Sequence, residues 1–388
     1  MIRRAAAACQ LLLWAPLGYL AAIAVAGLRS KETRRQGAGS LRLVILVPAH
    51  NEEAVLGETL SAMLATDYPD ERRRVIVIAD DCSDRTVEIA HAAGVEVWER
   101  VQPAPRGKGE ALRWAFARLL ESDGWDALVV IDADTITDAG AFRALEARLD
   151  DGADAVQARY NVANPEASVV ARLAEVSFAA QSVLRPRGRA ALGGSAKLQG
   201  NGMAFTRDLV ERHGWSGEGL AEDVDFWFRL LRAGIRPVYA GDAVVAGAMP
   251  TDVAAARVQR FRWEAGRSDL ARRHLLPGIR EAIVRRDPIL GEAVVSELLF
   301  PPLATTAALV GAAGALRYAT GRRGARIAAA QAATLAGYAL AGLHVSRAPR
   351  GTYLALALAP AVVVWKMAIK AESTVFGRRA EWKTTPRG

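Results

Sequence analysis

The chain has 388 residues, of which 51% are hydrophobic and 24% charged, and its formal net charge at pH 7 is +8. This length allows a sizeable core with further elements, and the hydrophobic share is high for a soluble enzyme, which points toward a membrane. Nucleic-acid binding is disfavoured, because no RRM, zinc-finger or helix-turn-helix signature accompanies the basic charge. The two cysteines, Cys9 and Cys82, show no framework spacing, which fits a reducing compartment.

The amino-terminal segment predicts a membrane anchor. Residues 9–28 carry no charge and are just long enough to cross a bilayer. A signal peptide is the alternative, because Arg3 and Arg4 make a basic start and Ala24-Val25-Ala26 resembles a cleavage site. The apolar run is long for a signal peptide, so we favour an uncleaved anchor. The basic residues that follow this run outnumber those that precede it, which predicts that the next domain is cytosolic.

From Leu41 onward, strand-like apolar runs alternate with helical patterns. The runs cover residues 43–47, 75–79, 95–98 and 127–131, and each of them leads to a polar cluster. Four strand–helix units in succession predict a parallel, right-handed, doubly wound sheet. All four polar clusters then lie along its carboxyl edge, where open α/β sheets bind their ligands.

The most informative of these clusters is an aspartate pair. Asp132 and Asp134 directly follow the last apolar run and lie one residue apart. Two hard oxygen donors on a strand-end turn suit Mg²⁺ or Mn²⁺, which keep waters and are completed by substrate phosphates. The pair therefore predicts a metal–diphosphate site. The alternative interpretation is an Asp-rich turn that caps the next helix.

Two further clusters on this edge suit a nucleotide. Asp80 and Asp81 offer acceptors for the N–H of a base or the hydroxyls of a ribose, although an Asx turn is the simpler alternative. The Gly107-Lys108-Gly109 loop lets backbone and ammonium approach a phosphate. It is not a Walker loop, since neither Ser nor Thr follows the lysine, and it is not the dinucleotide fingerprint. Hydride transfer is therefore disfavoured.

Three later segments carry signals of their own. Glu222 and Asp223 begin a helical pattern, a position at which the helix dipole favours acidic residues. Gln199–Met203 is a Gly-flanked polar loop that fits either a tight turn or contact with an acceptor. Residues 253–275 form a basic amphipathic stretch, which predicts a helix lying in the membrane interface.

The carboxyl-terminal third is largely apolar. Residues 298–316 and 327–346 are uncharged and predict membrane spans. Residues 352–369 are apolar but carry Lys366 near their end, so we expect them to lie in the interface. A basic tail completes the chain.

The order of these motifs resembles that of membrane-bound family 2 glycosyltransferases, such as the cellulose, chitin, hyaluronan and poly-N-acetylglucosamine synthases. The resemblance covers most of residues 41–270 and rests on Pro48-Ala49-His50-Asn51-Glu52, Asp80–Thr86, Arg106–Gly109, Asp132-Ala133-Asp134, Glu222-Asp223 and Gln259-Arg260-Phe261-Arg262-Trp263. It implies a GT-A fold and inverting transfer from a UDP-sugar. Cys82 departs from the usual Gly, and Gly200–Met203 stands in a variable acceptor loop, so the sugar stays open.

The same resemblance implies roles for individual residues. The donor and its uridine diphosphate would be held by Pro48, Asn51, Glu52, Asp80, Asp81, Lys108, Asp132, Asp134 and Arg262. The acceptor would contact Gly200, Asn201, Gly202, Gln259 and Trp263. Asp223, next to Glu222, would be the general base, and Asp132 and Asp134 would bind the Mg²⁺ or Mn²⁺ ion. A cytosolic gating loop that closes over UDP would include Trp382, Thr384 and Arg387; a frayed tail is the alternative.

We therefore predict an α/β protein with a GT-A domain, Rossmann-like and mostly parallel in its sheet, flanked by membrane helices. The expected domains are an anchor at 1–35, the transferase at 36–250, interfacial helices at 251–290, transmembrane or interfacial helices at 291–370 and a gating tail at 371–388. We expect an integral protein of a bacterial inner membrane with its catalytic domain in the cytosol. Its expected partners are a UDP-sugar, a glycan or lipid acceptor, the membrane, and a second copy or an export partner.

Three functions compete. The first is synthesis of a β-linked polysaccharide, which the Gln259–Trp263 box and the basic tail favour. The second is single-step transfer to a lipid, as in enzymes similar to ceramide glucosyltransferase. The third is a non-catalytic membrane scaffold, which is disfavoured because every expected acidic position is filled.

Overall fold

The computed structural model describes residues 2–101, 107–318 and 322–376, and the chain forms two compact units. The sheet unit comprises Lys31–Asn164 and Gly193–Met249, and the helical unit comprises Met1–Ser30, Pro165–Leu192 and Pro250–Gly388. Residues 165–192 fall inside the predicted transferase domain but belong to the helical unit. The reason is packing, since the helices of this insertion contact α2 (Trp14–Arg29) and α14 (Arg322–Ser346) of the helical unit.

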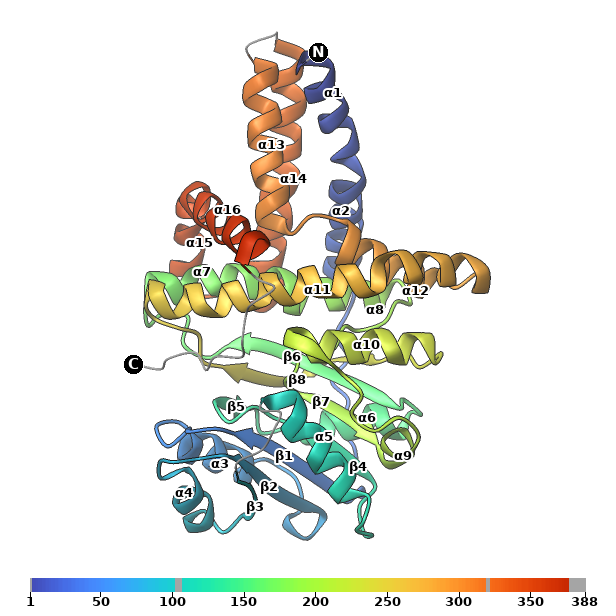
Figure 1. Ribbon diagram of the computed structural model, residues 1–388, viewed down its shortest axis with the longest axis vertical. Helices are drawn as coiled ribbons and strands as arrows, with labels where there is room; N and C mark the ends of the chain where they lie inside the picture. Colours follow the sequence, from blue (N-terminus) through green and yellow to red (C-terminus); the bar gives the residue numbers. More distant parts are fainter. Residues whose placement is uncertain (1, 102–106, 319–321, 377–388) are drawn as a thin grey trace. The chain divides into compact units, whose positions relative to one another are not determined.

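The sheet unit is built on an eight-stranded sheet with the order β3-β2-β1-β4-β7-β6-β8-β5 (Figure 1). Four of its seven strand pairs are parallel and three are antiparallel. The strands are β1 (Leu43–Ala49), β2 (Arg73–Asp80), β3 (Glu96–Arg100), β4 (Ala127–Val130), β5 (Thr135–Thr137), β6 (Ala155–Val162), β7 (Met203–Thr206) and β8 (Val238–Gly247). The predicted α/β architecture with a mostly parallel sheet is confirmed.

Helices cover the sheet because its strands are apolar on both faces, as buried parallel strands are. Ile45 and Val47 share one core cluster with Leu60 of α3 (Leu56–Leu64) and Phe142 of α6 (Ala141–Asp150). An aromatic cluster joins two further helices to the sheet, whose other helices are α4 (Thr86–Ala92) and α9 (Arg207–His213). Its ring pairs are Phe116 of α5 (Lys108–Leu119) with Phe205 of β7, 6.2 Å apart, and Phe205 with Phe226 of α10 (Glu222–Arg232), 5.7 Å apart.

The strand register brings the predicted polar clusters to one edge. β1 is parallel to both neighbours, with Ala49 opposite Ala79 of β2 and Leu46 opposite Val130 of β4. The residues that follow β1, β2 and β4 therefore leave the sheet on the same side. The prediction of a shared carboxyl edge is confirmed.

The segment that enters β1 is held by one buried carboxylate. Glu146 of α6 is 0% exposed and accepts backbone N–H bonds from Gly39, Ser40 and Leu41, at 2.6, 2.6 and 2.9 Å. A buried carboxylate with three such donors is well satisfied. Glu146 thus fixes the chain before β1, at the amino end of the strand and away from the polar edge.

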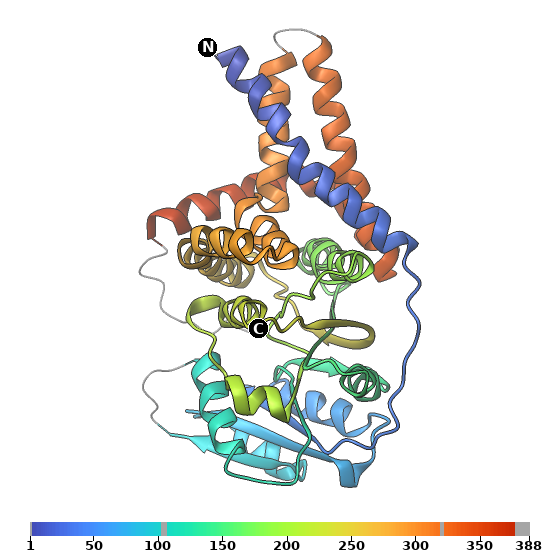
Figure 2. The same cartoon turned by 90° about the vertical axis from the view of Figure 1, so that its right-hand side faces the viewer.

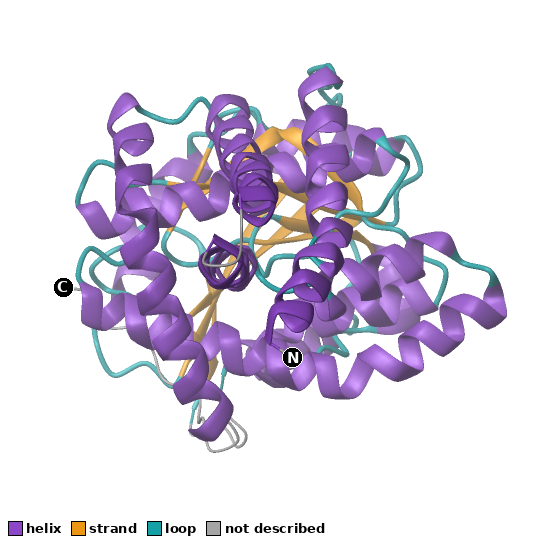
Figure 3. Ribbon diagram, turned by 90° about the horizontal axis from the view of Figure 1, so that it is seen from above, coloured by secondary structure: helices purple, strands orange, loops and turns teal. Residues whose placement is uncertain are grey.

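The described residues of the helical unit contain helices as their only regular elements, purple in Figure 3. These are α1 (Ile2–Leu12), α2 (Trp14–Arg29), α7 (Val169–Phe178), η2 (Ala179–Leu184), α8 (Arg185–Ala191), α11 (Val253–Arg285), α12 (Pro288–Val294), η4 (Val295–Leu299), α13 (Leu303–Tyr318), α14 (Arg322–Ser346), α15 (Arg350–Ala355), η5 (Leu356–Leu358) and α16 (Ala359–Phe376). α13 and α14 run side by side as an antiparallel pair (Figures 1 and 2). The predicted interfacial helix at 253–275 corresponds to the first part of α11.

Among the described residues, two helices are long and apolar enough to cross a membrane, Arg4–Arg29 and Arg350–Val375. A third candidate is the pair Pro288–Leu299 and Leu303–Tyr318, bent by 61°. The predicted spans at 9–28 and 298–316 fall within these segments. The predicted span at 327–346 is not among these candidates. Its helix α14 carries Gln331, which is 0% exposed and donates to the Gln10 carbonyl at 2.7 Å.

Candidate active site

The aspartate pair occupies a turn anchored on both sides. The Ile131 N–H donates to the Leu46 carbonyl at 3.0 Å, which extends the β1–β4 ladder up to the turn. The buried Thr59 hydroxyl of α3 donates to the Ala133 carbonyl at 2.8 Å. The next element is the strand β5, which begins at Thr135. The turn therefore does not cap a helix, and that alternative interpretation is wrong.

Lys108 joins the aspartate turn to a second loop. Its ammonium pairs with the Asp132 carboxylate and donates to the Gly200 carbonyl at 2.7 Å. Burial lowers the pKa of Lys108, but the carboxylates of Asp132, Glu222 and Asp223 outweigh that effect and raise it. Lys108 therefore stays charged in a pocket of carboxylates, where it can also meet a diphosphate.

The loop at 199–202 is held in place by the hydrogen bonds of two buried side chains, Gln157 and Asn201. Gln157 of β6 accepts from the Gln199 N–H at 2.9 Å and donates to the Asn201 carbonyl at 2.8 Å. The Asn201 amide, 0% exposed, donates to Thr135 Oγ1 at 2.8 Å and accepts from the Asp132 N–H at 3.2 Å. The Asn201 side chain thus holds the aspartate turn, and its predicted contact with an acceptor stays a prediction.

Two glycines of this loop have positive φ angles, and a side chain would be excluded at Gly202 and tightly placed at Gly200. Gly202 has φ +66°, and a Cβ there would lie 2.8 Å from Ala158 Cβ and 2.8 Å from Val245 Cγ2. A Cβ on Gly200, at φ +76°, would lie 3.3 Å from both Asp223 Oδ2 and Lys108 Nζ. The backbone of Gly200 therefore lies directly against the Asp223 carboxylate and the Lys108 ammonium.

Asp223 lies in the first turn of α10 and has the character of a proton acceptor. Burial raises the pKa of its carboxyl, and the charges of Lys108 and Lys197 lower it by less. A general base works best when its pKa approaches the operating pH, so the direction of this shift suits that role. Glu222, the neighbouring predicted residue, lies against the backbone of Gly109, where a Cβ would be 3.1 Å from its Cγ.

The loops after β1 and β2 are bonded to each other. Asn51 Oδ1 accepts from the Ser83 N–H at 2.8 Å, and Thr86 Oγ1 accepts from the Glu52 N–H at 2.8 Å. Asn51 and Asp81 have φ angles of +56° and +55°, which non-glycine residues adopt infrequently and mostly at special sites. These loops lie beside Pro48, the penultimate residue of β1. The predicted nucleotide-binding residues of both loops are thus brought together.

The two aspartates after β2 have different environments. Asp80 is 6% exposed and pairs with the Arg100 guanidinium at 2.8 Å. Burial raises the pKa of Asp80, against the opposing effects of Arg100 and the Gly107 N–H. This buried ion pair ties β2 to β3. Asp81 is partly exposed and is the better placed of the two to meet a ligand.

Asp132 and Asp134 fit a divalent cation that is shared with a substrate. Both are partly exposed carboxylates on the strand-end turn. Within the described ranges, no three His, Cys, Asp or Glu side chains gather to hold a metal ion. Two carboxylates are the donor set expected for Mg²⁺ or Mn²⁺ when substrate phosphates and waters complete the shell.

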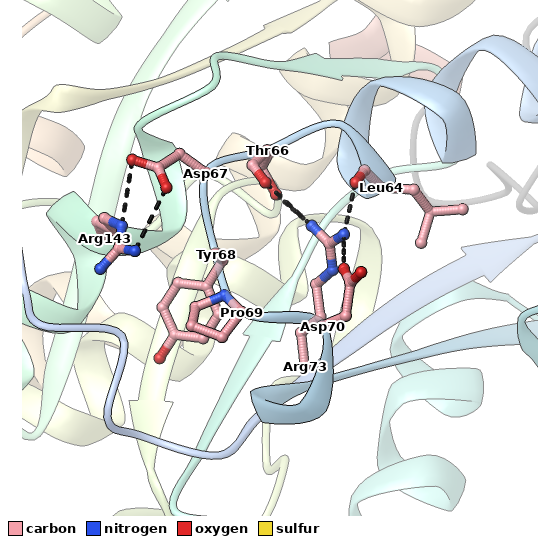
Figure 4. A pocket seen from close by; sticks show the side chains of 8 residues that line it. All are labelled: Leu64, Thr66, Asp67, Tyr68, Pro69, Asp70, Arg73 and Arg143. Atoms are coloured by element: carbon pink, nitrogen blue, oxygen red, sulfur yellow. Dashed lines mark hydrogen bonds and ion pairs between the residues drawn. The ribbon is translucent and has the colours of Figure 1, made fainter.

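A hollow of about 410 Å³ in the sheet unit is a different feature (Figure 4). It lies where α3 ends and β2 begins, at the amino end of the strands. Its two guanidinium groups are already paired: Arg73 donates to Thr66 Oγ1 at 2.8 Å, and Arg143 lies 3.3 Å from Asp67. Neither guanidinium is therefore unpaired and available to a phosphate. The interactions of Arg73 and Arg143 instead stabilise the turn between α3 and β2.

The Gln259–Trp263 box lies on α11 in the helical unit. Within that unit, the Arg260 guanidinium is 4.9 Å from the centre of the Trp263 ring, and the Phe178 ring is 6.2 Å from it. The roles of Gln259 and Trp263 toward an acceptor and of Arg262 toward the donor stay predictions. The predicted gating residues Trp382, Thr384 and Arg387 lie outside the described residues.

The sequence interpretation missed two buried residues that organise the site. Gln157 is a 0% exposed amide in β6, whose sequence AVQARYNV also contains Arg159 and Asn161, so no local signal singled it out. Asp225 is 0% exposed and accepts from Arg229 Nε at 2.8 Å and the Glu218 N–H at 3.2 Å. Asp225 thereby holds the loop that leads into α10 and, with it, the position of Asp223.

Comparison with known proteins gives the following matches. The family model described as glycosyltransferase like family 2 matches residues 42–266. The chain is 30% identical over 234 residues to a probable glycosyltransferase, YdaM, of Bacillus subtilis, covering 58% of this chain and 55% of that protein. It is 30% identical over 219 residues to beta-monoglucosyldiacylglycerol synthase of Trichormus variabilis, covering 54% of this chain and 45% of that protein. The chain thus spans about half the length of these relatives.

A solved structure supports the fold. The mannosyltransferase of Pyrobaculum calidifontis, determined with GDP-Man and Mn²⁺, matches with a TM-score of 0.59 and 20% identity. The match covers 88% of this chain and 99% of that one. At this identity the likeness concerns the fold, and it agrees with the GT-A architecture predicted from the motif order.

Proposed function

This chain belongs to glycosyltransferase family 2, and we propose that it is an inverting membrane enzyme that transfers a sugar from a UDP-sugar to a growing β-linked polysaccharide. One observation carries the proposal. The Asp223 carboxylate and the Lys108 ammonium converge over the backbone of Gly200, and Lys108 also pairs with Asp132. A base, a cation and a metal-type carboxylate are thus together at the carboxyl edge of the sheet.

Asp223 would act on the acceptor. It takes the proton from an acceptor hydroxyl while that oxygen bonds to the anomeric carbon of the donor sugar and the bond from that carbon to the diphosphate breaks. The electron pair leaves with UDP, and attack from the opposite face inverts an α-configured donor into a β-linked product. The raised pKa of the Asp223 carboxyl suits this proton transfer.

The donor would lie across the aspartate turn. Lys108 places a positive charge where the diphosphate departs, and its ion pair with Asp132 fixes the ammonium in position. Asp132 and Asp134 would hold Mg²⁺ or Mn²⁺, whose chemistry when bound is to neutralise charge on the leaving diphosphate. The bonded loops that carry Asn51 and Asp81 are available for the uridine.

A lipid acceptor is the second candidate. The relative from Trichormus variabilis is named beta-monoglucosyldiacylglycerol synthase, a name that specifies a lipid product for that protein. The same base and donor residues would serve, because a lipid hydroxyl and a glycan hydroxyl lose their protons in the same way. The two functions differ in whether the product is extended.

We place the enzyme in a bacterial inner membrane with its sheet unit in the cytosol. The candidate span Arg4–Arg29 and the basic residues that follow it support this orientation. Nucleotide sugars are cytosolic substrates, which requires the Asp223 side of the sheet unit to face that compartment. Self-association or an export partner would be needed to enclose a path for a polymer.

The experiment is an assay of the purified full chain in lipid nanodiscs with a panel of UDP-sugars and Mn²⁺ or Mg²⁺. UDP release, product size and digestion by linkage-specific hydrolases are measured together. A β-linked product that lengthens with time supports the proposal. A product that stays one sugar long on an extractable lipid at saturating donor supports the second candidate, and no UDP release from any donor overturns both.

A further inference from the structure

Gln157 uses both donors and the carbonyl oxygen of its amide inside the sheet unit. Its Oε1 accepts from the Gln199 N–H at 2.9 Å, and its Nε2 donates to the carbonyls of Ala158 at 2.9 Å and Asn201 at 2.8 Å. The side chain is 0% exposed. One amide from β6 therefore clamps both ends of the three-residue segment Gln199–Asn201.

That segment links the two sides of the proposed reaction. Its middle residue, Gly200, gives its carbonyl to Lys108 and lies beneath the Asp223 carboxylate. Its last residue, Asn201, bonds to the Asp132 N–H on the aspartate turn and to Thr135 at the start of β5. A shift of the segment would change the distance between the base and the donor without removing either group.

We propose that Gln157 is a positioning residue for sugar transfer: it holds Gln199–Asn201 in the register that sets the acceptor hydroxyl between Asp223 and the donor carbon. The inference rests on the proposed function. Gln157 does not touch the reacting atoms and acts through the segment. Displacement of reacting groups by about 1 Å costs about 100-fold in rate, so loss of the clamp acts mainly on the transfer step.

Two variants break the clamp in different ways. Gln157→Met keeps length and volume but removes the donor and the acceptor. Gln157→Glu keeps the acceptor for the Gln199 N–H and places a carboxylate against the two carbonyls that the amide served, so it also loses the clamp. A matched control is Glu146→Gln, which changes an equally buried side chain of the same unit at the amino end of the strands.

The measurements are kcat for transfer, KM for donor and acceptor, UDP release without acceptor, and the melting temperature. We expect both Gln157 variants to lose about 100-fold in kcat for transfer while donor KM and acceptor-independent UDP release stay at the wild-type level. Glu146→Gln should lower the melting temperature and leave kcat per folded enzyme unchanged. The Gln157 variants alone would thus lose kcat for transfer while they keep acceptor-independent UDP release.

Each other outcome has one meaning. If Gln157→Met lowers transfer and acceptor-independent UDP release in parallel, or matches Glu146→Gln at equal stability loss, Gln157 is structural and the inference fails. If either Gln157 variant transfers sugar at the wild-type rate, the inference fails as well. If the wild-type chain releases no UDP from any donor, the proposed function fails instead.

Discussion

Asp223→Asn is the substitution that tests the chemistry most directly. Asparagine keeps the size of the side chain but accepts no proton, so the acceptor hydroxyl loses its base. Positioned general bases contribute about 10²–10⁴-fold, which corresponds to about 3–5 kcal/mol in the activation barrier. Lys108 keeps its bonds to Asp132 and Gly200, so the donor side should survive. We expect kcat to fall by that factor and donor KM to stay unchanged.

The assay is steady-state transfer with UDP release, together with calorimetric binding of UDP in Mn²⁺. Asp208→Asn is a matched control, because it makes the same chemical change at an exposed carboxylate of the same unit, paired with Arg212. The control should retain full kcat. A loss of UDP affinity in Asp223→Asn that parallels its loss of turnover would refute the reasoning and make Asp223 a structural residue.

The raised pKa of Asp223 adds a pH dependence with a defined sign. The Asp223 carboxyl acts as a base only in its deprotonated form. We therefore expect kcat to fall as the pH drops through the pKa of this group, and to do so at a higher pH than for an ordinary Asp. The charges of Lys108 and Lys197 oppose the effect of burial on the Asp223 carboxyl. A raised folded-state pKa also means that stability from this group is lost as the pH rises through it. Asp223→Asn should therefore melt no lower than wild type at pH 8.

Three other changes have defined outcomes. Asp134→Asn should abolish metal-dependent turnover of UDP-sugar, because it removes a charge from the metal–diphosphate site; full activity of the wild type in chelator-treated membranes would contradict this. Gly202→Ala should lower the free energy of unfolding by about 1–3 kcal/mol, since its Cβ would lie 2.8 Å from Ala158 and Val245, and an unchanged denaturant midpoint would contradict it. Truncation after Arg379 should weaken donor retention and turnover but leave the melting of the sheet unit unchanged, as the resemblance of the tail to a gating loop implies; unchanged kinetics would make the tail a frayed end.

The sequence was most informative where strand ends carry chemistry. Apolar runs that end in polar clusters predicted β1, β2 and β4 and their shared edge, because parallel strands with short connections allow few other arrangements. The aspartate turn and Lys108 were found in the same way. These predictions need only local patterns and the rule that links them to one edge of the sheet.

Residues whose role depends on a distant partner were harder to assign. Asp80 is adjacent to Asp81, yet the register between β2 and β3 places Arg100 against Asp80 and leaves Asp81 partly exposed. No local signal distinguishes these two carboxylates. The insertion at 165–192 was missed for a similar reason, since its helical pattern says nothing about which unit it packs against.

The geometry of the 199–202 loop explains why the sequence of this segment did not predict the identity of the transferred sugar. Gly200 and Gly202 have no side chains, and the buried Asn201 amide bonds to Thr135 and Asp132. The backbone of Gly200 lies beside Asp223 and Lys108. Under the proposed function, residues 200–202 set where an acceptor oxygen meets the base, and none of the three presents an exposed side chain that could distinguish one sugar from another. Sugar specificity is therefore expected from other residues, and substitutions at these three positions should alter rate before they alter donor preference.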